Sequence, residues 1–206
     1  MREVIKSGKT VEEAVKAALT ELGVSEEEVE VEVLEEPSRG ILGLFGSRPA
    51  KVRVVRKPTP GEKAKALLEE ILRVMSLEGK VHLKEDAESV SLEVEGENLG
   101  VLIGRRGETL NALQYLLGLA ACRNSSVKKR VLLDVGGYRK KREETLRALA
   151  LRLAEKAKKR GRNIVLEPMS PQERRVIHMA LKGRDDIYTF SEGEEPFRKI
   201  VIAPRK

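Results

Sequence analysis

Apolar residues alternate with polar ones in three short stretches of residues 1–57, and these alternations predict strands. The stretches are REVIK at 2–6, VEVEVLEE at 29–36 and AKVRVVRK at 50–57, and the last two are predicted to pair. Between the first two, Thr10 and Glu13 match a capping box, and Gly23 can close the helix that follows. The apolar face of that helix is Val11, Ala14, Val15, Ala18, Leu19 and Leu22. Residues 1–57 are therefore predicted to form a small α/β module.

A second group of elements follows KPTPG, whose two prolines and glycine mark a boundary at residues 57–61. Apolar residues from Ala64 to Met75 recur at helical spacing, and KVHLKE and SVSLEVEG then alternate as two strands. ENLGVLIG is predicted to be a short helix, a longer leucine-rich helix follows, and KKRVLLDVGG is predicted to be a third strand. The order in residues 58–137 is therefore α-β-β-α-α-β.

The last third, residues 138–206, begins with a long helix whose start and end are basic. NIVLEP is predicted to be a strand, and Ser170, Pro171 and Glu173 are a strong start signal for another helix. Two strands around a Gly-Glu-Glu-Pro turn end the chain. The pattern predicts helices on a small three-stranded sheet, and the whole chain is predicted to be an α+β protein of three small modules.

The charge is distributed unevenly along the chain. Residues 1–60 hold 10 basic and 11 acidic side chains, residues 61–137 hold 11 and 12, and residues 138–206 hold 19 and 10, so the last third carries a net +9. A local excess of this kind indicates a surface for a polyanion, with nucleic acid as the leading candidate. Aromatic residues are only 3% of the chain, which argues against a sheet surface of exposed rings that stack bases.

Other features of the composition indicate a cytoplasmic protein. A single cysteine, Cys122, allows no internal disulfide and suits a reducing compartment. The N-terminus lacks the apolar core of a signal peptide, and no apolar run is long enough for a membrane span. No cluster of cysteine and histidine has zinc-ligand spacing, and the acidic residues are scattered. We expect no metal, no cofactor and no catalytic site.

The stretch LIGRRGETL joins two predicted helices and carries the first candidate site. A P-loop would need Lys and then Ser or Thr after Gly107, and a dinucleotide-binding fingerprint would need a strand before it, so both are excluded. The remaining pattern is Gly-x-x-Gly beside a three-stranded sheet. Gly104 and Gly107 let the backbone approach a sugar-phosphate chain, and the next helix points its free N–H groups there. Arg105 and Arg106 add charge, and Leu102 and Ile103 are predicted to form a floor for unstacked bases.

The second candidate site is the helix SPQERRVIHMALKG, residues 170–183. Its apolar residues face one side, and a basic face opposite them is predicted to contact phosphates. A basic face on an amphipathic helix can also be solvated surface without a ligand. The predicted contact residues are Arg174, Arg175, His178 and Lys182.

These motifs resemble known families. Residues 58–137 resemble a type II KH domain, which clamps about four nucleotides with a GXXG loop. The Arg-x-x-x-His pair in residues 138–206, Arg174 and His178, resembles the R-three-H domain, a family that binds single-stranded nucleic acid. GILGLFGSRPAKVRV at 40–54 resembles the Jag N-terminal domain, so the whole chain resembles the Jag family of bacterial RNA-binding proteins encoded beside a membrane insertase. The linker before the KH-like part is shorter here than in many family members.

The resemblance implies a cytosolic protein that binds single-stranded RNA, has a small KH-domain protein as its partner, and acts in post-transcriptional control of cell elongation, division or sporulation. The sequence leaves open RNA against single-stranded DNA, the oligomeric state, and two other classes of function. These are an RNA-processing enzyme and a scaffold near the membrane. The apolar tip of the first module is either a tight turn or an anchor for a protein partner, through Ile41, Leu42, Leu44 and Phe45.

Overall fold

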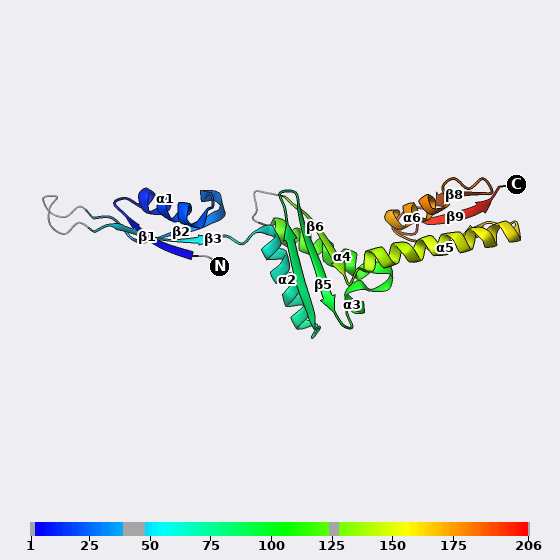
Figure 1. The fold of residues 1–206 in the computed structure, drawn as a ribbon, viewed down its shortest axis with the longest axis horizontal. Coiled ribbons are helices and arrows are strands. Elements are labelled where there is room, and N and C mark those ends of the chain that lie inside the picture. Colours follow the sequence, from blue (N-terminus) through cyan, green and yellow to red (C-terminus); the bar gives the residue numbers. More distant parts are fainter. Residues whose placement is uncertain (1–2, 39–47, 124–127, 206) are drawn as a thin grey trace. The chain divides into compact units, whose positions relative to one another are not determined.

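The computed structural model describes residues 3–38, 48–123 and 128–205, and its described part contains three small three-stranded sheets with helices (Figure 1). This is the predicted α+β class. The candidate residues Ile41, Leu42, Leu44 and Phe45 lie outside the described residues.

The first sheet has the strand order β1-β3-β2, with β1 at Glu3–Gly8, β2 at Val29–Glu35 and β3 at Ala50–Arg56. Both pairs are antiparallel, and the predicted pairing of the second and third stretches is confirmed. A short 3-10 turn at Glu26–Glu28 leads into β2. Helix α1 (Val11–Leu22) contacts β1 and β3, and its buried alanines and valine share a core with valines of the sheet.

The ends of α1 follow the sequence signals, with one difference. The Thr10 hydroxyl accepts a hydrogen bond from the Glu13 N–H at 3.2 Å, and Gly23 ends the helix in the left-handed region. The Glu13 carboxylate, however, accepts from the N–H of Lys9 at 2.9 Å, one residue before the cap. In the predicted capping box, the Glu13 carboxylate would accept from the N–H of Thr10; here it accepts from the N–H of the preceding residue, Lys9.

The second sheet has the order β4-β5-β6, with β4 at Gly79–Glu85, β5 at Ser89–Gly96 and β6 at Arg130–Val135. The helices are α2 (Pro60–Val74), α3 (Gly100–Ile103) and α4 (Glu108–Cys122), so the predicted order α-β-β-α-α-β is confirmed. Many of the residues that the alternation and the helical spacing predicted are buried, whereas Met75 and Leu116 are exposed. The buried ones are Ala64, Leu68, Leu72, Val81, Val90, Leu92, Val94, Leu110, Leu117, Val131 and Leu133.

The predicted boundary at residues 57–61 lies at the junction between β3 and α2. Helix α2 begins inside it at Pro60, because proline is favoured in the first turn of a helix. The Thr59 hydroxyl accepts a hydrogen bond from the N–H of Glu62 at 3.1 Å, and the Glu62 carboxylate accepts from the N–H of Thr59 at 2.8 Å. A reciprocal cap therefore starts the helix where the sequence indicated only a break.

The third sheet has the order β7-β9-β8, with β7 at Ile164–Val165, β8 at Ile187–Glu192 and β9 at Lys199–Pro204. Helix α5 (Tyr138–Arg160) contacts β9, and α6 (Pro171–Leu181) contacts α5, β8 and β9. Leu146, Ala150 and Ala157 of α5 are buried, as their helical spacing predicted. The same core contains Ile177, Leu181, Ile187, Ile200 and Ile202.

Candidate nucleic-acid interface

The Gly-x-x-Gly segment is a tight turn between two helices. Helix α3 ends at Gly104, residues Arg105–Gly107 form one 3-10 turn, and α4 begins at Glu108. Gly104 has φ 69° and ψ −170°, a region that only glycine occupies readily, and Gly107 has φ 81°. The free N–H groups at the start of α4 therefore lie directly beside the turn.

Both glycines are also required by close neighbours. A Cβ atom at Gly104 would lie 2.1 Å from Oγ1 of Thr109, and one at Gly107 would lie 2.9 Å from Cε1 of Tyr138. Tyr138 opens helix α5, and burial raises the pKa of its hydroxyl. The glycines thus fix the shape of the turn within the chain itself, in addition to letting a ligand approach its backbone.

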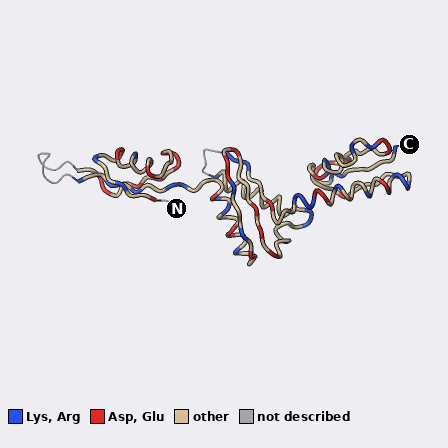
Figure 2. The backbone as a smooth tube through the Cα atoms, in the orientation of Figure 1, with Lys and Arg blue, Asp and Glu red and all other residues tan. Residues whose placement is uncertain are grey.

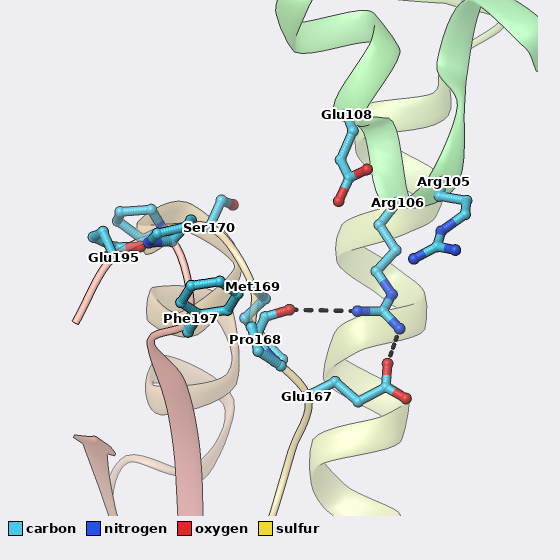
Figure 3. Close-up of a pocket in the computed structure, with 11 residues that line it drawn as sticks. Arg105, Arg106, Glu108, Glu167, Pro168, Met169, Ser170, Glu195 and Phe197 are labelled. Atoms are coloured by element: carbon cyan, nitrogen blue, oxygen red, sulfur yellow. Dashed lines mark hydrogen bonds and ion pairs between the residues drawn. The ribbon is translucent and has the colours of Figure 1, made fainter. Parts of the chain in front are cut away.

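The two arginines of the turn are exposed. Arg106 has φ 56°, an uncommon left-handed conformation for a residue other than glycine. Its guanidinium forms an ion pair with Glu167 and donates a hydrogen bond to the carbonyl oxygen of Pro168 at 3.4 Å (Figure 3). No carboxylate of the described residues lies within ion-pair distance of Arg105. The turn therefore offers one unpaired cation and one whose exposed partner a phosphate can replace at little cost.

A hollow of about 730 Å³ lies at this turn. Its lining combines Arg105, Arg106 and Glu108 with residues 167–171 and 195–197 (Figure 3). Phe197 is 75% exposed there, a large apolar side chain in a mostly polar wall. Phe197 was not among the predicted site residues, although its place directly after the Gly-Glu-Glu-Pro turn is a signal for exposure.

The predicted floor for bases is corrected by burial. Leu102 is 0% exposed, so it belongs to the core beneath the turn and presents no surface to a ligand. Ile103 is half-buried and is the only one of the pair with accessible surface. The apolar lead-in therefore supports the turn, and a base can reach it only at Ile103.

The start of helix α6 follows its sequence signals. Ser170 accepts a hydrogen bond from the N–H of Glu173 at 3.3 Å, and the Glu173 carboxylate accepts from the N–H of Ser170 at 3.2 Å. The same carboxylate lies 2.8 Å from Nε of Arg142 on α5, with both side chains largely buried. Glu173 therefore caps α6 and also ties it to α5.

Arg174 differs from the prediction of a solvent-facing contact residue. It is 9% exposed, its Nε donates to the carbonyl oxygen of Met169 at 3.3 Å, and its guanidinium forms an ion pair with Glu195. On the helix it lies about 20° from the buried Leu181, since seven residues make almost two full turns. Arg174 is thus placed at the edge of the apolar face, where it joins α6 to the segment before β9.

The other three predicted residues of this helix are exposed. Arg175 and Lys182 have no carboxylate within ion-pair distance in the described part of the chain. The Nδ1 atom of His178 lies 2.6 Å from Oγ1 of Thr189 on β8, which orients the imidazole against the sheet. The basic face of α6 therefore consists of Arg175, His178 and Lys182, without Arg174.

Helix α5 carries much of the remaining positive charge. Its sequence contains ten lysines and arginines, and they are dense at its two ends, RKKR at 139–142 and KKR at 158–160 (Figure 2).

In the described ranges, no helix is long and apolar enough to cross a membrane. No group of three or more His, Cys, Asp or Glu side chains that could hold a metal ion occurs among those same residues.

Comparison with known proteins matches the three parts of the chain to three families. Residues 6–56 match the Jag N-terminus, residues 62–135 match the KH domain of KhpA/KhpB, and residues 144–204 match the R-three-H domain. The chain is 42% identical over 208 residues to the RNA-binding protein KhpB of Clostridium symbiosum, covering 100% of this chain and 93% of that protein.

Two further relatives have the same name. The RNA-binding protein KhpB of Bacillus subtilis is 41% identical over 208 residues, and the match covers 100% of both chains. The one from Streptococcus pneumoniae is 31% identical over 137 residues, which cover 66% of this chain and 42% of that protein. The chain therefore belongs to the Jag family, the family of the RNA-binding protein KhpB, along its whole length.

Proposed function

We propose that this protein binds single-stranded RNA, with the Gly-x-x-Gly turn as the clamp on the backbone. The observation that carries the proposal is the turn itself. Two exposed arginines stand at the free N-terminal end of α4, in a conformation that its two glycines hold. The relatives named above are called RNA-binding proteins, which supports the same assignment. Arg105, Arg106 and Ile103 are the proposed contacts of this turn.

The basic last third supplies a second, electrostatic part of the binding. Residues 138–206 carry a net +9, whereas the residues around the turn, 61–137, carry a net −1. Each phosphate that a lysine or arginine neutralises releases counterions and raises the affinity at low salt. We assign this role to α5, to Arg175 and His178 of α6, and to Lys182 directly after that helix.

The test replaces the two arginines rather than the glycines. Any side chain at Gly104 or Gly107 strains the backbone, so a loss of binding there would not separate the site from the fold. Arg105→Asp with Arg106→Asp reverses the charge and keeps both glycines, and Asp tolerates the left-handed conformation of residue 106. We expect the affinity for a 20-nucleotide oligouridylate to fall at least about tenfold at fixed salt.

The matched control is Lys80→Glu with Lys84→Glu, which changes the net charge equally on the exposed side of β4. This control is expected to keep most of the affinity. Equal losses of affinity in both double variants would mean that net charge alone governs binding and that the Gly-x-x-Gly turn does not clamp the RNA backbone. A parallel titration with the matching DNA oligonucleotide decides between RNA and single-stranded DNA.

The remaining parts of the proposal concern organisation and cellular role. We assign residues 1–57, 58–137 and 138–206 as three domains, consistent with the start of α5 directly after Gly137. We also propose a cytoplasmic, non-catalytic protein with a role in post-transcriptional control of cell elongation, division or sporulation. Incubating bound RNA with Mg²⁺ or Mn²⁺ tests the absence of catalysis, because new cleavage products would instead indicate an RNA-processing enzyme.

A protein partner is a second proposed binding function, and a specific surface favours it. Helix α4 leaves Tyr115 68%, Leu116 51% and Leu119 55% exposed, one apolar patch on one helix. We propose that a small KH-domain protein packs on this patch. Tyr115→Glu with Leu119→Glu is expected to abolish the complex with that protein, measured by light scattering. If the wild-type chain alone already forms a dimer that this double variant lacks, the patch binds a second copy of the chain instead.

The apolar tip of the first module is the remaining candidate for protein contact, through Ile41, Leu42, Leu44 and Phe45. The proposal rests on the sequence, where four large apolar residues stand among three glycines. Capture of partners by the intact chain and by a variant with all four residues changed to serine tests it. Identical partners in both captures would make the tip a structural turn only.

A further inference from the structure

The sheet of the last third has one covered face and one open face. Side chains alternate along its strands, and Ile187 of β8 with Ile200 and Ile202 of β9 share a core with α5 and α6. Their neighbours in sequence, Tyr188, Phe190 and Val201, therefore point to the opposite face. The core that the sheet shares with α5 and α6 lies on the first face.

Two aromatic rings stand side by side on the open face. Tyr188 and Phe190 are 44% and 41% exposed, and their ring centroids lie 5.8 Å apart with planes 19° from parallel. Strand pairing places Phe190 opposite Val201, which in turn pairs with the 50% exposed Val165 on β7. Val201 is buried, so a continuous apolar floor crosses all three strands beneath the rings. Two of the chain's six aromatic residues thus gather on one accessible surface.

Cations border this surface at the Tyr188 end. Tyr188 lines a hollow of about 720 Å³ together with Lys158, Asn163, Asp186 and Arg205. The carboxylate of Asp186 lies 2.6 Å from a guanidinium nitrogen of Arg184 and 3.1 Å from Nζ of Lys158. Hydrogen bonds from these two cations lower the pKa of Asp186. The negative charge of its carboxylate is therefore balanced by Arg184 and Lys158 within the fold. Arg205 is exposed and has no ion-pair partner in the described ranges.

The basic face of α6 lies close to the same edge strand, β8, on the covered side of the sheet. Thr189 lies between Tyr188 and Phe190 in β8, and its hydroxyl is the group 2.6 Å from Nδ1 of His178. Since β8 is an edge strand, the exposed side chains of α6 and the two rings lie on either side of that one strand. A flexible chain with regularly spaced anions and flat bases can contact both, with phosphates at α6 and bases at the rings.

We propose that the open face of this sheet, defined by Val165, Tyr188 and Phe190, is a stacking platform for unpaired bases of single-stranded RNA. The proposal rests on the proposed function of the chain and adds a second contact for the bound strand, away from the Gly-x-x-Gly turn. Nearly parallel exposed rings bordered by Lys158 and by the unpaired Arg205 suit a single-stranded nucleic acid, since bases stack on rings while phosphates meet the charges.

The first experiment measures the affinity of the full chain for a 20-nucleotide oligouridylate. Tyr188→Leu with Phe190→Leu keeps an apolar surface and removes only the rings, so the fold is expected to survive. We expect the affinity to fall about 30-fold, as the loss of two base-stacking contacts predicts. The slope of log K against log salt is expected to stay unchanged, because no charge is removed. Tyr188→Phe should bind like the wild type.

The second experiment places a reporter at the platform. The chain has no tryptophan, so Phe190→Trp introduces a single one, and stacking of a base on it should quench its fluorescence. Ile5→Trp is the matched control, because residue 5 is 51% exposed on β1 in the first sheet. Quenching at position 190 and none at position 5 supports the platform.

The outcomes separate this inference from the function on which it rests. If the wild-type chain does not bind the oligonucleotide, both the proposed RNA binding and the stacking platform are wrong. If the Arg105→Asp, Arg106→Asp variant loses affinity while the leucine variant binds like the wild type, RNA binding stands and the stacking platform is wrong. If the leucine variant binds RNA like the wild type but loses a protein partner, the open face is a surface for protein contact.

Discussion

The glycine turn and the Arg-His helix both carry short motifs, but the residues that define each motif have different roles. In the turn, Gly104 and Gly107 hold the backbone while Arg105 and Arg106 remain exposed. In the helix, the first residue of the motif, Arg174, is buried against Met169 and Glu195. A basic residue of such a motif can therefore serve the fold, and we propose its exposed neighbours as the contacts with nucleic acid.

The two regions also differ in how their basic side chains are distributed. The turn places two arginines at a fixed position in a segment whose net charge is −1. The last third spreads 19 basic side chains over α5, α6 and the sheet, with a net +9. A fixed pair determines position on the strand, whereas a diffuse excess raises affinity for any polyanion. Substitutions in the two regions can separate these roles.

The largest expected effect is on stability at the turn. Gly104→Ala puts a Cβ 2.1 Å from the Thr109 hydroxyl oxygen in a conformation that alanine avoids, so we expect the free energy of unfolding to fall by about 2–4 kcal/mol. Urea denaturation measures it. The control is Gly118→Ala in α4, where a Cβ meets no atom within 4 Å and helix propensity should add up to about 1 kcal/mol. A Gly104→Ala variant as stable as the wild type would mean that the turn is not held by its glycines.

The second prediction compares the adjacent arginines of α6. Arg174→Ala removes the hydrogen bond to Met169 and the ion pair with Glu195, and we expect it to lower the free energy of unfolding by about 1–3 kcal/mol. Arg175→Ala should change it by less than about 0.5 kcal/mol, because the side chain is exposed and unpaired. Thermal unfolding of the two single variants under one condition makes the comparison. Equal destabilisation by both substitutions would contradict the assigned roles.

The smallest expected effect is on the salt dependence of RNA binding. Arg175→Ala with Lys182→Ala removes two proposed phosphate contacts, so the slope of log K against log salt should decrease by about 1.4 in magnitude, at roughly 0.7 per contact on a single strand. Lys80→Ala with Lys84→Ala on β4 is the control and should keep the wild-type slope. If the slope of the α6 variant does not change, the exposed face of that helix is not a phosphate surface.

The order of elements could be predicted because each has a clear local signal. Alternation marked the strands, and Ser170 with Glu173 marked the start of α6. Arg174 was predicted to lie opposite the apolar residues, although a helical wheel puts it about 20° from Leu181. The wheel alone does not show whether another segment covers such a residue at the edge of the apolar face. The covering partner, Glu195, lies 21 residues further along the chain. Only the assembled sheet brings the two together.

The open face of the last sheet gives a second example. A low aromatic content argued against a surface of exposed rings, yet Tyr188 and Phe190 both point away from the helices. The fraction of aromatic residues says how many rings the chain has, and the alternation along β8 decides where they point. Leu102 shows the reverse case, since an apolar residue beside a binding motif was predicted to contact bases and is fully buried.

The most direct test of the account is an NMR spectrum of the arginine side chains of the full chain, recorded as single-stranded RNA is added. The Nε–Hε signals of Arg105, Arg106 and Arg175 are expected to shift, because these guanidinium groups are exposed and are the proposed phosphate contacts. The signal of Arg174 is expected to stay in place, because its Nε already donates to Met169. A shift of Arg174 with no change at Arg105, Arg106 and Arg175 would contradict the account.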